Sequence, residues 1–183
     1  MNGPRERPGA RPVVSWAGEQ ALAVRRPGIA MIPPSVQAVL DAHDLEALEF
    51  EPGSTPTSEL AAARIGVAVG QIAKSILLKG KDGRFYLVVA AGDQRLDNRR
   101  LKETIGVKAR MATAEETERE TGFRPGGVCP FGVDGVEVLV DVSLDRYDVV
   151  YPAAGTDASG VPMTFEQLLA VTGGRRCDVT RSE

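Results

Sequence analysis

The chain has 183 residues, 43% of them hydrophobic, which suits one folded domain with a short appendage and excludes a disordered chain. The net charge is −3, so no global basic field attracts nucleic acid. No apolar run approaches the roughly 20 residues that cross a bilayer, and the arginine-containing N-terminus has no apolar core of a signal peptide. We therefore expect a cytoplasmic protein that binds neither membranes nor DNA.

Cysteine and histidine are scarce, which narrows the chemistry. The two cysteines, Cys129 and Cys177, do not make a disulfide framework, and with the single histidine they have no metal-ligand spacing. His43 falls near the end of a predicted surface helix, where we expect it to be solvated. We expect no metal and no cofactor, so any chemistry must come from lysine, carboxylates, hydroxyls, backbone amides and water.

The N-terminal half predicts an extension followed by a folded domain. Residues 1–30 hold four prolines, five arginines and no sustained period, which predicts a flexible extension; Met31 would then be a natural start of a domain over 31–183. Within that domain we expect a helix opened by Pro33-Pro34-Ser35, a short strand over 45–51, and a second helix from Pro56-Thr57-Ser58 to Gly66.

The sequence after Gly66 predicts alternating strands and helices. Residues 72–79 and 84–91 form a β-hairpin through a short glycine-rich link. Capping pairs, Thr113 with Glu116 and Thr164 with Gln167, open two later helices that end at Gly122 and Gly173. The other expected elements are a helix over 96–105 and strands over 107–111, 136–142 and 147–151. This mixture indicates a mixed α/β (α+β) fold in which helices flank a central mixed sheet.

Lys74 is the first candidate for a functional residue. Strand side chains alternate between faces, so Lys74 shares its face with Ile72, Ile76 and Leu78. An ammonium group on an apolar face is costly to desolvate unless something anionic or polar meets it there, which makes the residue a functional candidate. Alternatively, the methylene groups of Lys74 lie along the apolar surface and its ammonium group reaches water near the start of the strand.

The second candidate is the loop from Gly126 to Gly132, which includes Gly127, Val128, Cys129 and Pro130. Glycines let a backbone approach a ligand and direct amide groups at an oxyanion; an ordinary tight loop is the alternative. Cys129 has no evident base partner, so we expect it to line a pocket and not to act as a nucleophile.

Two further loops and one basic segment complete the candidates. Asp93 or Asp97 could cap the helix that follows, and Arg95 could pair with either acid or meet a phosphate. Segment 74–110 carries ten Lys/Arg against four acids, compatible with an RNA end on this side or simply with a solvated charged face. Loop 154–160, with Gly155, is either a pocket rim or a plain surface loop.

Taken in order, these segments resemble the YbaK/ProX family, also called the aminoacyl-tRNA synthetase-associated domain. The resemblance covers roughly residues 31–172 and rests on the following segments: Ala73-Lys74-Ser75, Gly92-Asp93-Gln94-Arg95-Leu96-Asp97, Arg110-Met111-Ala112, Thr121 to Gly132, and Ala154-Gly155. It implies a mixed, partly barrel-like sheet flanked by helices, and hydrolysis of the ester that joins an amino acid to the 3′ ribose of mischarged tRNA.

The same resemblance assigns the site. Lys74 takes the place of the family's key lysine, and residues 126–130 take the place of the loop that lines the aminoacyl pocket, with Cys129 where serine is common. Gly155 would also bind substrate, while Asp93 and Arg95 would support the structure or the tRNA 3′ end. The implied partners are aminoacyl-tRNA and a synthetase. Two alternatives are a non-catalytic module that binds aminoacyl-tRNA or a synthetase, and a hydrolase or lyase of free amino-acid derivatives.

Overall fold

The computed structural model describes residues 32–182, so the predicted extension over 1–30 and Met31 lie outside the described residues. Its α-helices begin and end where the sequence signals predict, apart from α3. Thr57, Thr113 and Thr164 accept a backbone N–H as N-caps, and left-handed glycines follow the same three helices. The five described helices are α1 (Pro34–Ala42), α2 (Ser58–Ile65), α3 (Asn98–Ile105), α4 (Ala114–Thr121) and α5 (Phe165–Thr172).

A six-stranded mixed sheet forms the centre of the described chain, in the order β5-β2-β3-β6-β9, with β7 also paired to β2. The predicted hairpin is its middle: β2 and β3 are antiparallel from Ala73–Ala91 to Lys79–Phe85. The strands of this sheet are β2 (Ile72–Gly80), β3 (Phe85–Ala91), β5 (Ala109–Met111), β6 (Glu137–Asp141), β7 (Tyr151–Pro152) and β9 (Arg175–Cys177).

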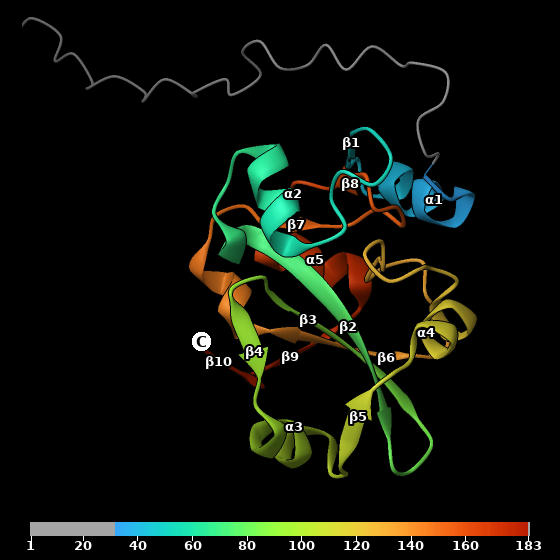
Figure 1. Ribbon diagram of the computed structural model, residues 1–183, viewed down its shortest axis with the longest axis vertical. Helices are drawn as coiled ribbons and strands as arrows, with labels where there is room; N and C mark the ends of the chain where they lie inside the picture. The colour runs from blue at the N-terminus through green and yellow to red at the C-terminus, as the bar shows by residue number, and fades with distance from the viewer. Residues whose placement is uncertain (1–31, 183) are drawn as a thin grey trace, which may run out of the picture.

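Four short strands and two 3-10 helices complete the fold. They are β1 (Leu48–Glu49) with β8 (Ser159–Gly160), β4 (Gln94–Leu96) with β10 (Thr180–Ser182), and the 3-10 helices η1 (Val69–Gln71) and η2 (Val142–Arg146). Figure 1 shows β2 running diagonally through the molecule, with α2 over its first half, α3 and β5 near its end, and β4 with β10 along one side.

Hydrophobic side chains fill both faces of the sheet. Alternate residues of β3 enter different clusters: Leu87 and Val89 pack with Phe131 and Leu168, whereas Val88 packs with Leu101 under α3. A strand buried on both faces reads as a continuous apolar run, as β3 does. The core therefore fixes the position of β2, which carries Lys74.

Several predicted elements are wrong in extent. The strand predicted over 45–51 is only Leu48–Glu49, and the strand predicted over 147–151 is only Tyr151–Pro152. The helix predicted over 96–105 begins at Asn98, because Leu96 lies in β4 and Asp97 caps the helix by accepting from the amides of Arg99 and Arg100. In each case, pairing with a strand distant in the sequence, or a cap, decides the boundary.

The C-terminal strands were not predicted, and one buried carboxylate explains their position. Asp141, at the end of β6, is fully buried and accepts hydrogen bonds from the Val179 amide at 2.7 Å and the Thr180 hydroxyl at 2.8 Å. These bonds join the segment after α5 to the central sheet, where β9 pairs with β6 and β10 pairs with β4. Between residues 32 and 182, no helix is both long and apolar enough to cross a membrane.

Candidate active site

A cavity of about 250 Å³ opens beside the first half of β2. Its walls come from four parts of the chain: the segment leading into α2 with α2 itself, strand β2, the glycine loop, and the stretch between β7 and β8. Most lining side chains are small and either apolar or hydroxylic. They are Thr55, Pro56, Thr57, Ser58, Ala61, Ile65, Ile72, Ala73, Lys74, Ser75, Gly126, Val128, Tyr151, Ala153 and Ser159.

Lys74 brings a charge into this wall. Its Nζ donates a hydrogen bond to the carbonyl oxygen of Gly92 at 3.1 Å and another to that of Gln94. In the part of the chain that the structure describes, it is the only charged residue that lines the cavity. The ammonium is therefore half-buried and held by backbone dipoles, in contrast to a lysine that extends into bulk water.

The turn at Gly92–Gln94 is itself held firmly. A Cβ on Gly92 would lie 2.4 Å from the Val69 carbonyl oxygen, so only glycine fits this close approach. Asp93 does not cap a helix; its carboxylate pairs with the Arg146 guanidinium of η2 at 2.8 Å. The close approach to Val69 and the ion pair with Arg146 thus hold the turn that positions the Lys74 ammonium.

The glycine loop reaches the cavity through two of its residues. Gly126 and Val128 line it, whereas Gly127 packs against the next loop, since a Cβ there would lie 2.8 Å from the Thr156 carbonyl carbon. The amide of Gly127 already donates to the Arg124 carbonyl at 3.0 Å, so it closes a turn and is not directed at a ligand. Any oxyanion donor from this loop must come from Gly126 or Val128.

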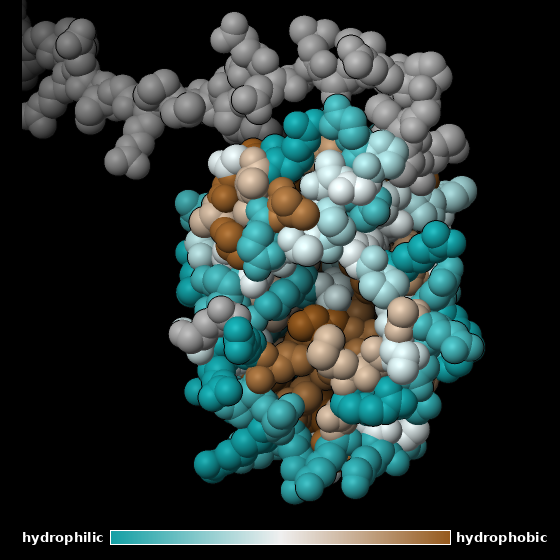
Figure 2. Space-filling view, in the orientation of Figure 1, coloured by the Kyte–Doolittle hydropathy of each residue, from teal (hydrophilic) through white to brown (hydrophobic). Residues whose placement is uncertain are grey.

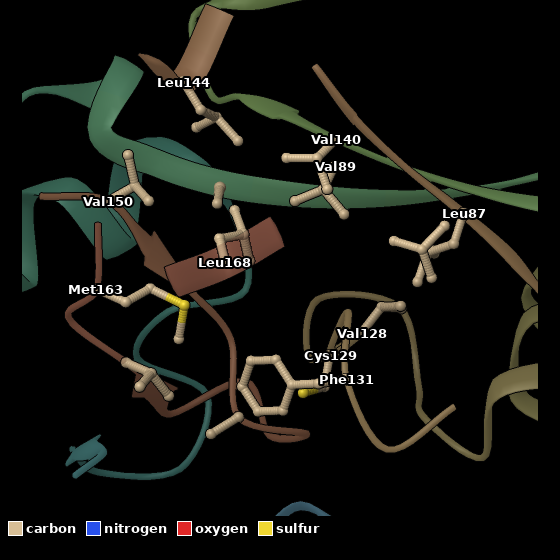
Figure 3. Close-up of a cluster of buried hydrophobic side chains, with 14 of the residues drawn as sticks. Leu87, Val89, Val128, Cys129, Phe131, Val140, Leu144, Val150, Met163 and Leu168 are labelled. Atoms are coloured by element: carbon tan, nitrogen blue, oxygen red, sulfur yellow. The ribbon is translucent and has the colours of Figure 1, made fainter. Parts of the chain in front are cut away.

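Cys129 and Pro130 lie behind the cavity wall. The Cys129 side chain is fully buried in the larger core cluster, and Figure 3 shows its sulfur beside the Phe131 ring. Burial raises the pKa of the Cys129 thiol far above its ordinary value, which excludes a thiolate near neutral pH. Pro130 is buried as well, and neither residue lines the cavity.

The loop over 154–160 reaches the cavity through Ser159 and not through Gly155, and Ala153 directly before the loop also lines the cavity. Gly155 has a positive φ of 85° and packs against Phe123 and Pro33, away from the cavity lining. Hydrogen bonds tie this loop to the segment before α2, from Thr55 N to Asp157 O at 2.7 Å and from Phe50 N to Ala158 O at 2.8 Å. The two segments therefore form one continuous wall.

Arg95 and His43 lie outside the cavity. Arg95 is exposed on β4, opposite Arg181 of β10. His43 is exposed at the end of α1, where the sequence places it. No group of three or more His, Cys, Asp or Glu side chains among residues 32–182 is arranged to hold a metal ion.

Sequence reasoning missed much of the polar lining, above all Ser75. Its Oγ is buried and has no hydrogen-bond partner within the described residues, so a polar atom of a ligand would satisfy it. Pro56-Thr57-Ser58 was interpreted only as a helix start, although all three residues also line the cavity. The signal available was the position of Ser75, directly after Lys74 in a mostly apolar strand.

A second cavity, of about 460 Å³, lies beyond the turn that holds Lys74 and is lined by Glu59, Val69, Gly92, Asp93, Gln94, Arg146 and Ser182. The pKa of Glu59 lies below its ordinary value, because the carboxylate accepts from its own backbone amide and from Thr57 and also feels the charge of Lys74. The positive charge of Lys74, which lines the first cavity, therefore also acts on a carboxylate in the second.

Comparison with known proteins identifies the family of the chain. The model of the aminoacyl-tRNA editing domain matches residues 52–171, and the chain therefore belongs to this family, the YbaK/ProX family. The chain is 45% identical to the uncharacterized protein YwhH of Bacillus subtilis (strain 168) over 121 residues, which cover 66% of this chain and 76% of YwhH. It is also 35% identical to a proline–tRNA ligase of Bacillus licheniformis over 101 residues, or 54% of this chain and 18% of the ligase.

A solved structure extends the match to the fold. The crystal structure of a proposed trans-editing enzyme for prolyl-tRNA synthetase aligns with a TM-score of 0.74 and 34% identity, and the alignment covers 83% of this chain and all of that one. The predicted class, a central mixed sheet flanked by helices in the YbaK/ProX manner, is confirmed. The matched span of the editing domain includes every residue that lines the first cavity.

Proposed function

We propose that this protein is a trans-editing deacylase, which hydrolyses the ester between an amino acid and the 3′ ribose of mischarged tRNA. Membership in the editing-domain family supports the reaction class. The observation that carries the proposal is Lys74, a cation fixed by two backbone carbonyls in the wall of a cavity otherwise free of charge in the described chain. The cavity would receive the aminoacyl group.

The chemistry required is ester hydrolysis. A water oxygen attacks the carbonyl carbon and the bond to the ribose oxygen breaks. The leaving ribose oxygen takes up a proton that the water gives up and becomes a hydroxyl. The Lys74 ammonium would fix the carbonyl oxygen or the 3′ end, and it would favour negative charge that develops on that oxygen. Buried hydroxyls such as that of Ser75 would hold the substrate in position, which contributes through orientation. No step of this proposal uses a metal.

The lining restricts the amino acid. Small apolar residues and hydroxyls, with a single cation, suit a small uncharged side chain and disfavour a lysyl or arginyl group beside Lys74. Two of the similar proteins are a proline–tRNA ligase and a proposed editing enzyme for prolyl-tRNA synthetase. We therefore propose tRNA(Pro) carrying a small wrong amino acid as the substrate, with prolyl-tRNA synthetase as the partner whose errors are corrected.

The Lys74→Ala variant tests this function. We expect deacylation of the best substrate, chosen from a panel of mischarged tRNA(Pro), to fall about 100-fold or more, the loss typical of removing one transition-state donor. Lys81→Ala is the matched control, because Lys81 is an exposed lysine in the hairpin turn; it should retain full activity. Near-wild-type turnover by Lys74→Ala would remove the residue from the mechanism.

The assay also separates a deacylase from a non-catalytic module of the same fold. A domain that only binds the aminoacyl end would shield the ester, so its addition would slow the spontaneous hydrolysis of mischarged tRNA. A deacylase accelerates the same reaction in proportion to its concentration. A hydrolase of free amino-acid derivatives would turn over simple aminoacyl esters as well as charged tRNA.

A further inference from the structure

An apolar hollow lies on the same face of the molecule as β2, outside both cavities. Figure 2 shows it as a recessed brown area, in the region that Figure 1 places between β2, β4, α3 and β5. Partly buried side chains from these elements pack against the core cluster that contains Val88 and Leu101. Met111 is 66% exposed, the most of any large hydrophobic residue described. We define the hollow by Ile76, Leu96, Ile105, Ala109 and Met111.

The hollow is continuous with the candidate active site along β2. On one edge, β2 pairs with β7 only at Ile72–Ala73 and with β5 only at Leu78–Gly80, so residues 74–77 have no strand beside them there in the described chain. Lys74, Ile76 and Leu78 share one face, and Met111 is the cross-strand partner of Leu78. At about 3.3 Å per residue, Met111 lies about 13 Å along the strand from Lys74, a distance that a few nucleotides can span.

Most charged side chains on the elements around the hollow are positive. On β2, β4, α3 and β5, every charged side chain except Glu103 is a lysine or an arginine, although the whole chain has a net charge of −3. Lys79 and Arg110 belong to the opposite side of the sheet, where Glu116 of α4 pairs with both. Two of the cations on α3 have acidic partners, Glu103 for Arg99 and Asp178 for Arg100. The remaining lysines and arginines of β2, β4 and α3 nevertheless outnumber their acidic partners beside the exposed apolar floor.

We propose that the apolar hollow is the docking surface for the unpaired 3′ nucleotides of tRNA, whose aminoacyl end lies at Lys74. Single-stranded nucleic acid presents apolar base faces and anionic phosphates together, and proteins bind it with apolar or aromatic platforms inside a positive groove. The hollow has both features, and it begins at the residue where the ester is placed. The inference rests on the proposed function for the identity of the RNA.

The Met111→Glu variant tests the proposal on two substrates. Its side chain is exposed, so the variant should fold. We expect kcat/KM on mischarged tRNA to fall about tenfold, mainly through KM, because a carboxylate replaces a base-stacking surface and repels phosphate. Activity on an aminoacyl-adenosine, which has no upstream nucleotides, should be unchanged. Leu48→Glu is the matched control: Leu48 is also an exposed large hydrophobic residue, on β1 away from the hollow, and it should behave as wild type on both substrates.

Other results would overturn the proposal. An equal loss on both substrates would place Met111 in the catalytic cavity, and no loss on either would leave the hollow without a role in tRNA docking. A change of oligomeric state in light scattering, with tRNA turnover intact, would assign the hollow to a second copy of the chain. If the wild-type protein cleaves neither substrate, the proposed function fails, and docking is decided by fluorescence anisotropy with a single-stranded RNA that ends in CCA: weaker binding by Met111→Glu supports it and equal binding refutes it.

Discussion

At the scale of single residues, burial separates the candidates that the sequence could only group together. The sequence placed Lys74 and Cys129 together at one pocket, Lys74 as its cation and Cys129 as part of its lining. The structure gives Lys74 two carbonyl acceptors at a cavity, whereas Cys129 is enclosed by the core. Alternation along a strand predicts which face Lys74 occupies, but the direction of a side chain from an irregular loop depends on what packs against that loop.

The burial of Cys129 leads to a prediction about its replacement by serine. Cys129→Ser puts a hydroxyl into an apolar core, which should lower the free energy of unfolding by about 1–3 kcal/mol. Deacylation per folded molecule should stay near the wild-type value, because the thiol touches no substrate. Chemical denaturation and turnover at a temperature where the variant is folded measure the two effects. Loss of turnover in a variant of unchanged stability would instead identify the thiol as a participant.

At the scale of elements, the turn at Gly92–Gln94 connects η1, η2 and β2. Its carbonyls hold the Lys74 ammonium, and the Asp93–Arg146 pair fastens the turn to η2. Both partners are roughly half exposed, so the pair contributes little to stability. Arg146 is therefore a positioning residue in the proposed reaction: it acts on the substrate only through the turn and Lys74.

We expect Arg146→Ala to lower kcat up to about tenfold, which corresponds to about 1.4 kcal/mol in the barrier, with little change in KM or melting temperature. Asp93→Asn should have the same effect, and the double variant should be no worse than either single one. Arg176→Ala is the control, because Arg176 pairs with Asp145 of the same 3-10 helix at similar exposure but does not contact the turn. A rise in KM for Arg146→Ala alone, with Asp93→Asn unaffected, would show instead that the guanidinium binds RNA directly.

At the scale of the whole molecule, one carboxylate joins three elements on the side of the sheet opposite the hollow. Glu116 of α4 completes the cap with Thr113 and pairs with Arg110 of β5 and Lys79 of β2. The Arg110 guanidinium, the Thr113 amide and the Lys79 ammonium hold the pKa of Glu116 well below its ordinary value. The ionised carboxylate of Glu116 thus stabilises the folded state.

The sign of the pH dependence follows from this lowered pKa. The stabilisation from Glu116 is fully present above the ordinary carboxyl pKa of about 4.3 and is lost as pH falls toward the lower folded value. Glu116→Gln keeps a cap acceptor but removes the charge. We expect it to melt below wild type at pH 7, with the difference shrinking as pH falls below about 4, as measured by thermal melts from pH 7 to 3. A constant difference across that range would mean that ionisation of Glu116 does not contribute.

The sequence by itself determined most helices, the central hairpin and the family. Caps such as Thr113 with Glu116, and the alternation from Ile72 to Leu78, are local signals set by backbone geometry within a few residues. The short glycine-rich link between the strands over 72–79 and 84–91 was sufficient to predict the hairpin that β2 and β3 form. Lys74 could be singled out because strand periodicity alone places it on an apolar face.

Only the tertiary structure decided which residues share the cavity with Lys74. Ser75, Ser159 and Tyr151 meet there because loops distant in sequence pack against the edge of β2. Cys129 and Pro130 are buried outside the cavity lining, and Gly155 packs against Phe123 and Pro33. The C-terminal strands likewise depend on hydrogen bonds to Asp141 across the fold. Such contacts are decided by the packing of the whole chain, because a loop or a short edge strand has no period of its own to fix its direction.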